Sequence, residues 1–132
     1  MKKYIILIIV FLLLIIFYLF KKEEIDNILN PNNVKIKVSN NFNFGEISVN
    51  DTILHDFYVK NVSNNELTIK NVISNCGCTI TDFEKESKKN NDSARVSIKF
   101  IPNKVGYVKQ NIVLEANTVP PFTILKIEGV IK

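Results

Sequence analysis

Short segments in which apolar and polar side chains alternate fill residues 34–132, and this alternation most constrains the fold. The clearest segment is 94–100, where four apolar residues are separated by Arg95, Ser97 and Lys99. A period of two places the apolar side chains on one face of a β-strand. Comparable segments, separated by turn residues, lie at 34–38, 42–47, 53–59, 67–72, 79–83, 106–114 and 125–129. The pattern predicts an all-β domain, an immunoglobulin-like antiparallel β-sandwich of about seven strands.

A long apolar segment precedes these strands. Residues 4–20 contain no charged residue, proline or glycine. As a helix they span roughly 25 Å, and flanking lysines can extend to the head groups of a bilayer core about 30 Å thick. We therefore expect one N-terminal transmembrane helix over 4–20 that contacts membrane lipid, within an anchor of residues 1–22. The polar residues 23–33 are expected to be a linker to the domain at 34–132.

Two other interpretations of this segment are disfavoured. A cleaved signal peptide ends in small residues, but no alanine precedes Ala94 and no glycine precedes Gly45. A core helix of a soluble protein is rarely so uniformly apolar. Two lysines lie on each side of the segment, and the amino terminus adds a charge on the proximal side. We expect a single-pass protein of the cytoplasmic membrane, with the N-terminus inside and the β-domain extracytoplasmic.

The charge of the chain argues against nucleic-acid binding. The net charge of +4 arises from 17 basic and 13 acidic residues, and Lys2, Lys3, Lys21 and Lys22 flank the apolar segment. The remaining basic and acidic residues balance. A nucleic-acid-binding domain requires a basic patch or stripe. None is visible, so the basic character reflects the membrane-flanking lysines.

Cys76 and Cys78, the two cysteines of the chain, are separated by Gly77 and followed by Thr79. A disulfide between them would close a tiny ring, would stabilise the fold little and would be easily reduced, which suits redox exchange. Two thiolates also suit Cu(I), with His55 as a weak candidate for a further ligand. Alternatively the cysteines are passive and Gly77 permits a sharp turn before the strand that begins at Thr79. All three alternatives remain open.

His55 is the single histidine of the chain. It shares a strand face with Phe57 and Val59, whereas Asp56 faces the other way. We expect His55 to pack at the edge of the core rather than to act as a ligand or catalytic base. No catalytic triad, phosphate-binding glycine loop or paired-carboxylate cleft can be argued from the sequence.

Several short motifs give the chain a recognisable family resemblance. They are Phe44-Gly45-Glu46-Ile47, His55-Asp56-Phe57, Lys60-Asn61, Leu67-x-Ile69-x-x-Val72, Cys76-Gly77-Cys78-Thr79, Gly106, Asn117 and Ile127-Glu128-Gly129-Val130. Over residues 42–130 the chain resembles the bacterial domain of unknown function 1573 family, for which the Cys-Gly-Cys-Thr motif is the hallmark. It departs from the family pattern in two turns, at Asn61-Val62-Ser63 and Asn90-Asn91-Asp92. The resemblance implies an Ig-like sandwich related to Hydin-like and major-sperm-protein domains, and an envelope location, but no activity.

These observations favour a binding or scaffolding module of the cell envelope, anchored in the membrane and without catalytic activity. Its expected partner is another envelope protein, and neither a small-molecule substrate nor a cofactor is expected. The alternative function is thiol chemistry at Cys76 and Cys78, either disulfide exchange or Cu(I) handling. Cys76, Gly77, Cys78 and Thr79 are therefore the candidate site residues.

Overall fold

The computed structural model describes residues 2–29 and 33–132, and the chain divides into two compact units, Met1–Asn33 and Val34–Lys132. The first unit contains the helix α1, Lys2–Leu29. The helix therefore continues through 23–29, most of the segment expected to be a linker. Residues 30–32 of that expected linker lie outside the described residues. The helix outlasts the apolar segment because Glu23, Glu24 and Leu29 favour helix in themselves.

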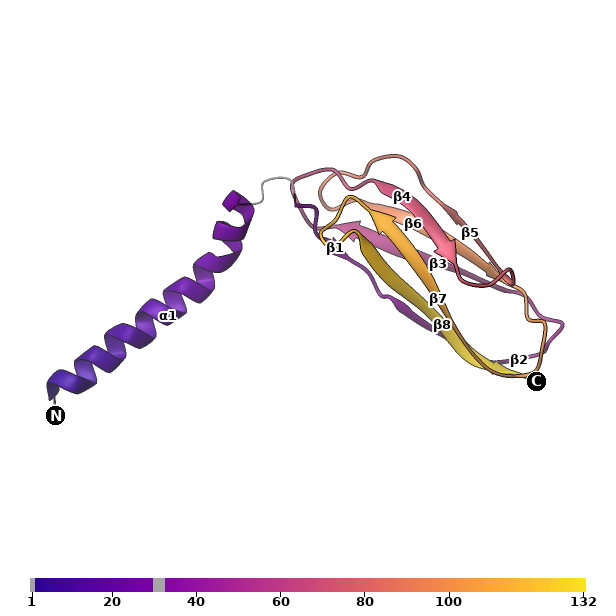
Figure 1. Cartoon of the computed structure of the whole chain (residues 1–132), viewed down its shortest axis with the longest axis horizontal. Helices are drawn as coiled ribbons and strands as arrows, with labels where there is room; N and C mark the ends of the chain where they lie inside the picture. The colour runs from indigo at the N-terminus through magenta and orange to yellow at the C-terminus, as the bar shows by residue number, and fades with distance from the viewer. Residues whose placement is uncertain (1, 30–32) are drawn as a thin grey trace. The chain divides into compact units, whose positions relative to one another are not determined.

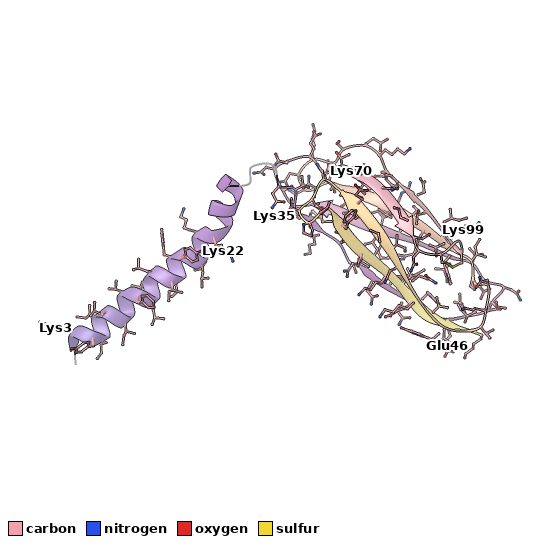
Figure 2. All side chains as sticks on the ribbon, viewed as in Figure 1. Lys3, Lys22, Lys35, Glu46, Lys70 and Lys99 are labelled. Carbon is pink, nitrogen blue, oxygen red and sulfur yellow. A yellow bond between two sulfur atoms is a disulfide. The ribbon has the colours of Figure 1, made fainter. Side chains whose placement is uncertain are left out.

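Within α1 the segment Lys3–Lys22 is long and apolar enough to cross a membrane, by length and composition. All side chains from Lys3 to Lys22 are exposed. Lys3 and Lys22 mark the two ends of the apolar part (Figure 2). A helix that is apolar on every side has no polar face to turn toward water, so it needs apolar surroundings.

The second unit is a β-sandwich of eight strands in two four-stranded sheets (Figure 1). The sheet orders are β1-β3-β6-β5 and β2-β8-β7-β4. The strands are β1 Ile36–Lys37, β2 Asn41–Ile47, β3 Ile53–Asn61, β4 Ile69–Ser74, β5 Thr79–Phe83, β6 Ser93–Phe100, β7 Gly106–Ala116 and β8 Phe122–Ile131. The predicted all-β sandwich is confirmed, and each alternating segment of the sequence corresponds to one strand.

One pairing differs from the expected antiparallel arrangement. β2 runs parallel to β8, whereas the other paired strands are antiparallel. The chain leaves the first sheet after β1 and enters the second sheet as β2 without reversing through a hairpin, and therefore keeps its direction. Gly45, with φ of +71°, lies at a register shift in this pairing. A glycine adopts this backbone conformation at little cost, which allows the strand to bend there.

The inward side chains of both sheets form one apolar core. Its buried members are Val34, Phe57, Val59, Leu67, Ile69, Val72, Ala94, Val96, Ile98, Phe100, Ile112, Leu114, Ala116, Leu125, Ile127 and Ile131. Phe44 packs on Phe100 with ring centroids 5.8 Å apart, and it occupies the space that a side chain at Gly129 would need. A glycine at 129 is thus required by the close approach of the aromatic ring.

Candidate functional site

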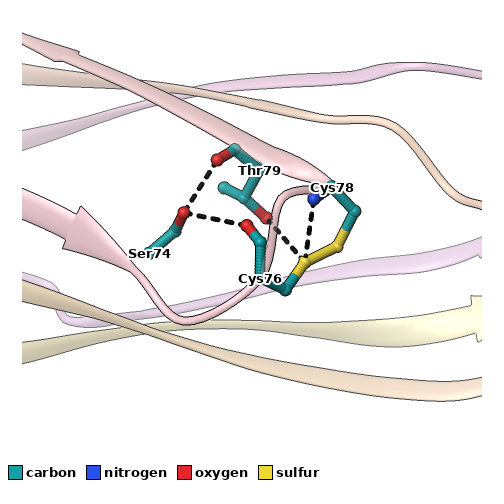
Figure 3. The surroundings of a disulfide bond; sticks show 4 residues. All are labelled: Ser74, Cys76, Cys78 and Thr79. Carbon is teal, nitrogen blue, oxygen red and sulfur yellow. Dashed lines mark hydrogen bonds between the residues drawn. A yellow bond between two sulfur atoms is a disulfide. The ribbon is translucent and has the colours of Figure 1, made fainter.

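The loop of residues 75–78 connects β4 to β5 and crosses from one sheet to the other. In it Cys76 and Cys78 form a disulfide with their Cα atoms 5.3 Å apart (Figure 3). Both cysteines are half-buried and Gly77 between them is exposed. The sulfur pair therefore lies at the surface, at one end of the sandwich, where a second molecule can reach it.

Hydrogen bonds from the flanking strands hold the loop. The Ser74 hydroxyl donates to the carbonyl oxygens of Cys76 and Thr79, at 3.0 and 2.8 Å. The Thr79 amide donates to the same Cys76 carbonyl at 3.3 Å. The Thr81 hydroxyl donates to the Val72 carbonyl at 3.0 Å. These bonds join β4 to β5 across the open side of the sandwich, so the loop is supported independently of the disulfide.

The role expected for Gly77 is not what the structure shows. Its backbone lies outside the left-handed region, and a Cβ added there would meet no atom within 4 Å. The turn between the two sulfurs is therefore open to any L-residue. It forms because the Ser74 and Thr79 hydrogen bonds close it.

A shallow groove of about 380 Å³ lies beside the disulfide. It is lined by Cys76, Gly77, Cys78, Ile101, Pro102 and Asn103. The Ile101 amide donates a hydrogen bond of 2.8 Å to the Cys78 carbonyl, which fixes the second wall of the groove against the loop. Ile101 is 43% exposed. No lining residue carries a charge, so the groove suits an uncharged segment rather than an ion.

His55 packs between two aromatic rings. Its imidazole stacks on Phe42 of β2, with ring centroids 3.6 Å apart, and meets Phe57 edge-on at 4.6 Å. Desolvation lowers the pKa of His55, and the charge of Asp56 offsets part of this shift. The structure thus places His55 at the edge of the core, as predicted. It faces inward from β3, which β6 separates from the strand beginning at Thr79.

Within the described residues, no group of three or more His, Cys, Asp or Glu side chains is arranged to hold a metal ion. Cys76, Gly77 and Cys78 lie together in the loop, Thr79 follows them as the first residue of β5, and His55 lies apart from all four. The four residues of the sequence motif thus form one local site.

The outer face of the β2-β8-β7-β4 sheet carries a feature that the sequence did not reveal. Ile73 pairs with Val113, and Val113 pairs with Ile124, so three apolar side chains form a row across β4, β7 and β8. Ile73 is 53% exposed and Ile124 46% exposed. Phe122, 57% exposed, pairs with Glu115 one step along the sheet. We call Ile73, Val113 and Ile124 the apolar row.

The outer face of the other sheet provides a contrast. Its exposed residues Leu54 and Ile80 both pair with Lys99, which separates them, and its exposed Tyr58 pairs with Arg95. One step further along, Ser97 lies between two aspartates, Asp56 and Asp82. Charged side chains that interrupt the apolar ones are typical of a sheet face exposed to water. The apolar row is therefore specific to one face.

Asn61 has a structural role that the sequence did not reveal. It is fully buried, and its side-chain amide donates to the carbonyl oxygens of Asn65 and Lys88, both at 2.8 Å. Its side-chain oxygen accepts from the amide and the hydroxyl of Ser63, at 2.9 and 2.7 Å. All four hydrogen-bonding positions of the side chain are used. This role is structural, and only the spatial proximity of Lys88 reveals it.

Comparison with known proteins places the second unit in a family. A family model described as "Protein of unknown function (DUF1573)" matches residues 34–131. No curated protein sequence matches the chain. The matched segment coincides with the β-sandwich and includes the loop of residues 75–78 and the apolar row.

Several solved structures share the fold at low sequence identity. A protein of unknown function from Porphyromonas gingivalis W83 aligns with a TM-score of 0.66 at 13% identity, over 75% of this chain and 47% of that one. The ASH / PapD-like domain 7 of human CEP192 aligns with a TM-score of 0.59 at 12% identity, over 76% and 86%. The Vibrio cholerae VesB protease aligns with a TM-score of 0.60 at 11% identity, over 86% and 35%. This chain thus spans about half the length of the first of these structures, and the similarities concern the fold alone.

Proposed function

We propose a function from the premise that this chain belongs to the DUF1573 family: it is a membrane-anchored binding or scaffolding module of the cell envelope, without catalytic activity. An Ig-like or PapD-like sandwich fits a binding or scaffolding role. The observation that carries the proposal is the apolar row of Ile73, Val113 and Ile124 on one outer face. Contiguous exposed apolar side chains with a polar surround are characteristic of protein interaction surfaces.

The occupant of this face is another envelope protein. Polar side chains border the apolar row on both sides, with Glu115 in the next register position and Lys126 in the position beyond Ile124. The border of the apolar row carries side chains of both charges. A folded partner protein can complement such a border, because its own surface also carries charges of both signs. A lipid surface would instead favour a basic border.

The helix α1 is the basis for the proposed attachment of the chain to a membrane. Its segment Lys3–Lys22 has the length and composition of a membrane span. A single span with the N-terminus in the cytoplasm would hold the β-sandwich on the outer side of the cytoplasmic membrane. Protease added to sealed cells should then degrade the sandwich, and protection of the sandwich until the membrane is opened would contradict this orientation.

Site-specific photocrosslinking in living cells tests the binding face. A photoreactive amino acid is placed at Asn111 or Glu115, which border the apolar row, and at Asp56 on the opposite face as the matched control. We expect one common protein product from the first two positions and none from Asp56. The change Ile124→Lys should abolish that product, because it places a charge in the middle of the apolar row.

Two outcomes contradict the proposal. Equal crosslinking from Asp56 would show that the face is not selective. A product consisting of two copies of this chain would replace the envelope partner with self-association. Circular dichroism of the Ile124→Lys variant in detergent verifies that the sandwich remains folded, so that loss of the product reports on binding.

A second candidate function is thiol–disulfide exchange at Cys76 and Cys78, and the position of this half-buried bridge beside an open groove favours it. A bridge that closes only a three-residue segment restrains little chain and is readily reduced. The two thiolates released by reduction could also hold Cu(I), which prefers sulfur ligands. Replacing both cysteines with serine should abolish exchange or copper binding and leave the crosslink from Glu115 unchanged.

A further inference from the structure

The two sulfur atoms of the Cys76–Cys78 bridge have different surroundings. The backbone amide of Cys78 donates a hydrogen bond of 3.1 Å to Sγ of Cys76, and Oγ1 of Thr79 lies 4.0 Å from the same sulfur (Figure 3). The Cys78 side chain packs against the hydrophobic core. Within residues 33–132, both hydrogen-bonding contacts to a sulfur atom of the bridge involve Sγ of Cys76. The bridge is therefore asymmetric.

This asymmetry makes one of the two sulfur atoms the better leaving group during thiol–disulfide exchange. A thiolate that attacks one sulfur of a disulfide forms a new S–S bond there, and the other sulfur departs with the electron pair of the broken bond. Hydrogen bonds to the departing sulfur stabilise its developing negative charge. The Cys78 amide and the Thr79 hydroxyl are in place to do this for Cys76. Charge on Cys78 would instead develop against apolar side chains, where it is disfavoured.

The groove beside the bridge indicates which thiol can approach. Apart from the loop itself it is lined by Ile101, Pro102 and Asn103, and it holds about 380 Å³. Ile101 and Pro102 offer apolar contact and the Asn103 side chain offers an amide. These groups fit a short stretch of uncharged polypeptide around a cysteine. A small anionic thiol such as glutathione finds no positive side chain among the lining residues.

We propose that the bridge is a directional exchange site for cysteine-containing polypeptide segments with apolar neighbours. The substrate thiolate attacks Sγ of Cys78, forms a mixed disulfide with it and releases Cys76 as a thiolate. A second thiol of the same substrate then loses its proton and attacks the substrate sulfur of the mixed disulfide. The substrate leaves as a disulfide and Cys78 leaves as a thiolate. Two electrons pass from the substrate dithiol to the bridge, and the two protons it loses are taken up by Cys76 and Cys78.

This inference rests on the second candidate function, thiol exchange, and not on the binding role of the apolar row. Its test uses the full chain in detergent micelles with the bridge intact. The probe is the monothiol peptide acetyl-Leu-Cys-Leu-amide, with glutathione at the same thiolate concentration as the comparison. Aliquots are quenched early with acid and alkylated, and mass spectrometry then locates the peptide and the alkyl group.

We expect the peptide on Cys78 and the alkyl group on Cys76 in at least about tenfold excess over the reverse. The peptide should also react several-fold faster than glutathione. The variant Thr79→Val keeps the side-chain shape but removes the hydroxyl near Cys76, so it should reduce the Cys78 preference about threefold. Thr81→Val is the matched control because its hydroxyl bonds to the Val72 carbonyl and not to a sulfur, and it should keep the preference.

The possible outcomes separate the two levels of the proposal. Rapid reaction with the peptide mainly on Cys76, or evenly divided, would overturn the direction while exchange itself stands. A Thr79→Val variant with an unchanged preference would remove the hydroxyl from the explanation. A bridge that reacts with neither probe over hours would overturn both the direction and the second candidate function.

Discussion

The two ends of the β-sandwich are held together in opposite ways. At the end where β3 finishes, Asn61 is completely buried, and its side chain ties the following turn, at Ser63 and Asn65, to the separate stretch of backbone at Lys88. At the other end, where β3 begins, Ile53 pairs with Phe100 and Phe100 with Thr79, next to the half-exposed disulfide. A noncovalent network in the interior thus contrasts with a covalent bond at the surface.

The difference shows that a covalent bond need not be the main stabilising feature. The Asn61 side chain joins residues up to 27 positions apart, so losing it separates distant segments. The disulfide joins residues two positions apart and restrains almost no chain. We therefore assign stability to the Asn61 end and chemistry to the disulfide end. The predictions below test this assignment, beginning with the largest expected effect.

Asn61→Ala should destabilise the domain by about 3–5 kcal/mol, because it removes a fully buried side chain that makes four hydrogen bonds. Urea denaturation followed by circular dichroism measures this loss. The matched control is Asn64→Ala in the same turn, where one exposed hydrogen bond to Asn90 is removed. Its expected cost is below about 0.5 kcal/mol. Similar losses for the two variants would contradict the special role of Asn61.

Gly129→Ala should cost about 1–3 kcal/mol, because the new methyl group would overlap with the ring of Phe44 and with the carbonyl oxygen of Gly45, and only the ring can be made smaller by substitution. The variant tests whether packing of Phe44 on Phe100 in the core stabilises the disulfide end of the sandwich. The double variant Gly129→Ala with Phe44→Leu provides the control. Part of the loss should be recovered in the background of the smaller side chain, and a cost identical in both backgrounds would exclude the predicted overlap.

Replacing both Cys76 and Cys78 with serine should cost less than about 1 kcal/mol, because the closed segment is so short. Denaturation of the unaltered chain with and without reductant provides an independent estimate of the same quantity. A loss comparable with that of Asn61→Ala would reverse the comparison and make the disulfide a structural element.

Gly77→Ala should change the stability by no more than about 0.5 kcal/mol, since the backbone there is accessible to alanine and the added methyl group meets open space. The same variant should slow reaction of the bridge with peptide thiols, because the methyl group projects beside the groove. Gly106→Ala, at φ of +120°, is the contrasting variant and should be clearly destabilised.

Acid should produce the smallest effect, through His55. Desolvation lowers its pKa in the folded chain below the usual 6.5, so the folded state favours the neutral ring. The stabilisation is therefore fully present above pH 6.5 and is lost as the pH falls through the lowered folded value. His55→Phe should remove this part of the pH dependence, measured by denaturation between pH 7.5 and 4.5. An unchanged profile would assign the dependence to other groups.

The strands were largely predictable because their alternation is local. Residues 79–83 and 94–100 were recognisable from neighbouring side chains, and the structure has β5 at Thr79–Phe83 and β6 at Ser93–Phe100. The placement of His55 beside Phe57 followed from strand periodicity in the same way.

The candidate site was predictable only in part. The motif Cys76-Gly77-Cys78-Thr79 directed attention to the right loop, but the role expected for Gly77 was wrong. The turn is closed by Ser74, whose hydroxyl reaches a carbonyl beyond the loop, and nothing local in the sequence signals this contact. The apolar row was also beyond prediction, because Ile73, Val113 and Ile124 become neighbours only through the register of three strands.

The strand-forming segments, the apolar helix that precedes them and the closely spaced pair of cysteines follow from local sequence, because each depends on residues close together in the chain. Three features appear only in the folded domain. β2 runs parallel to β8, the buried side chain of Asn61 hydrogen-bonds to Lys88, and the hydrogen bonds to the disulfide are made to the sulfur of Cys76. The physical reason is that burial and hydrogen bonding between distant segments depend on strand order and register, and many orders satisfy the same local pattern.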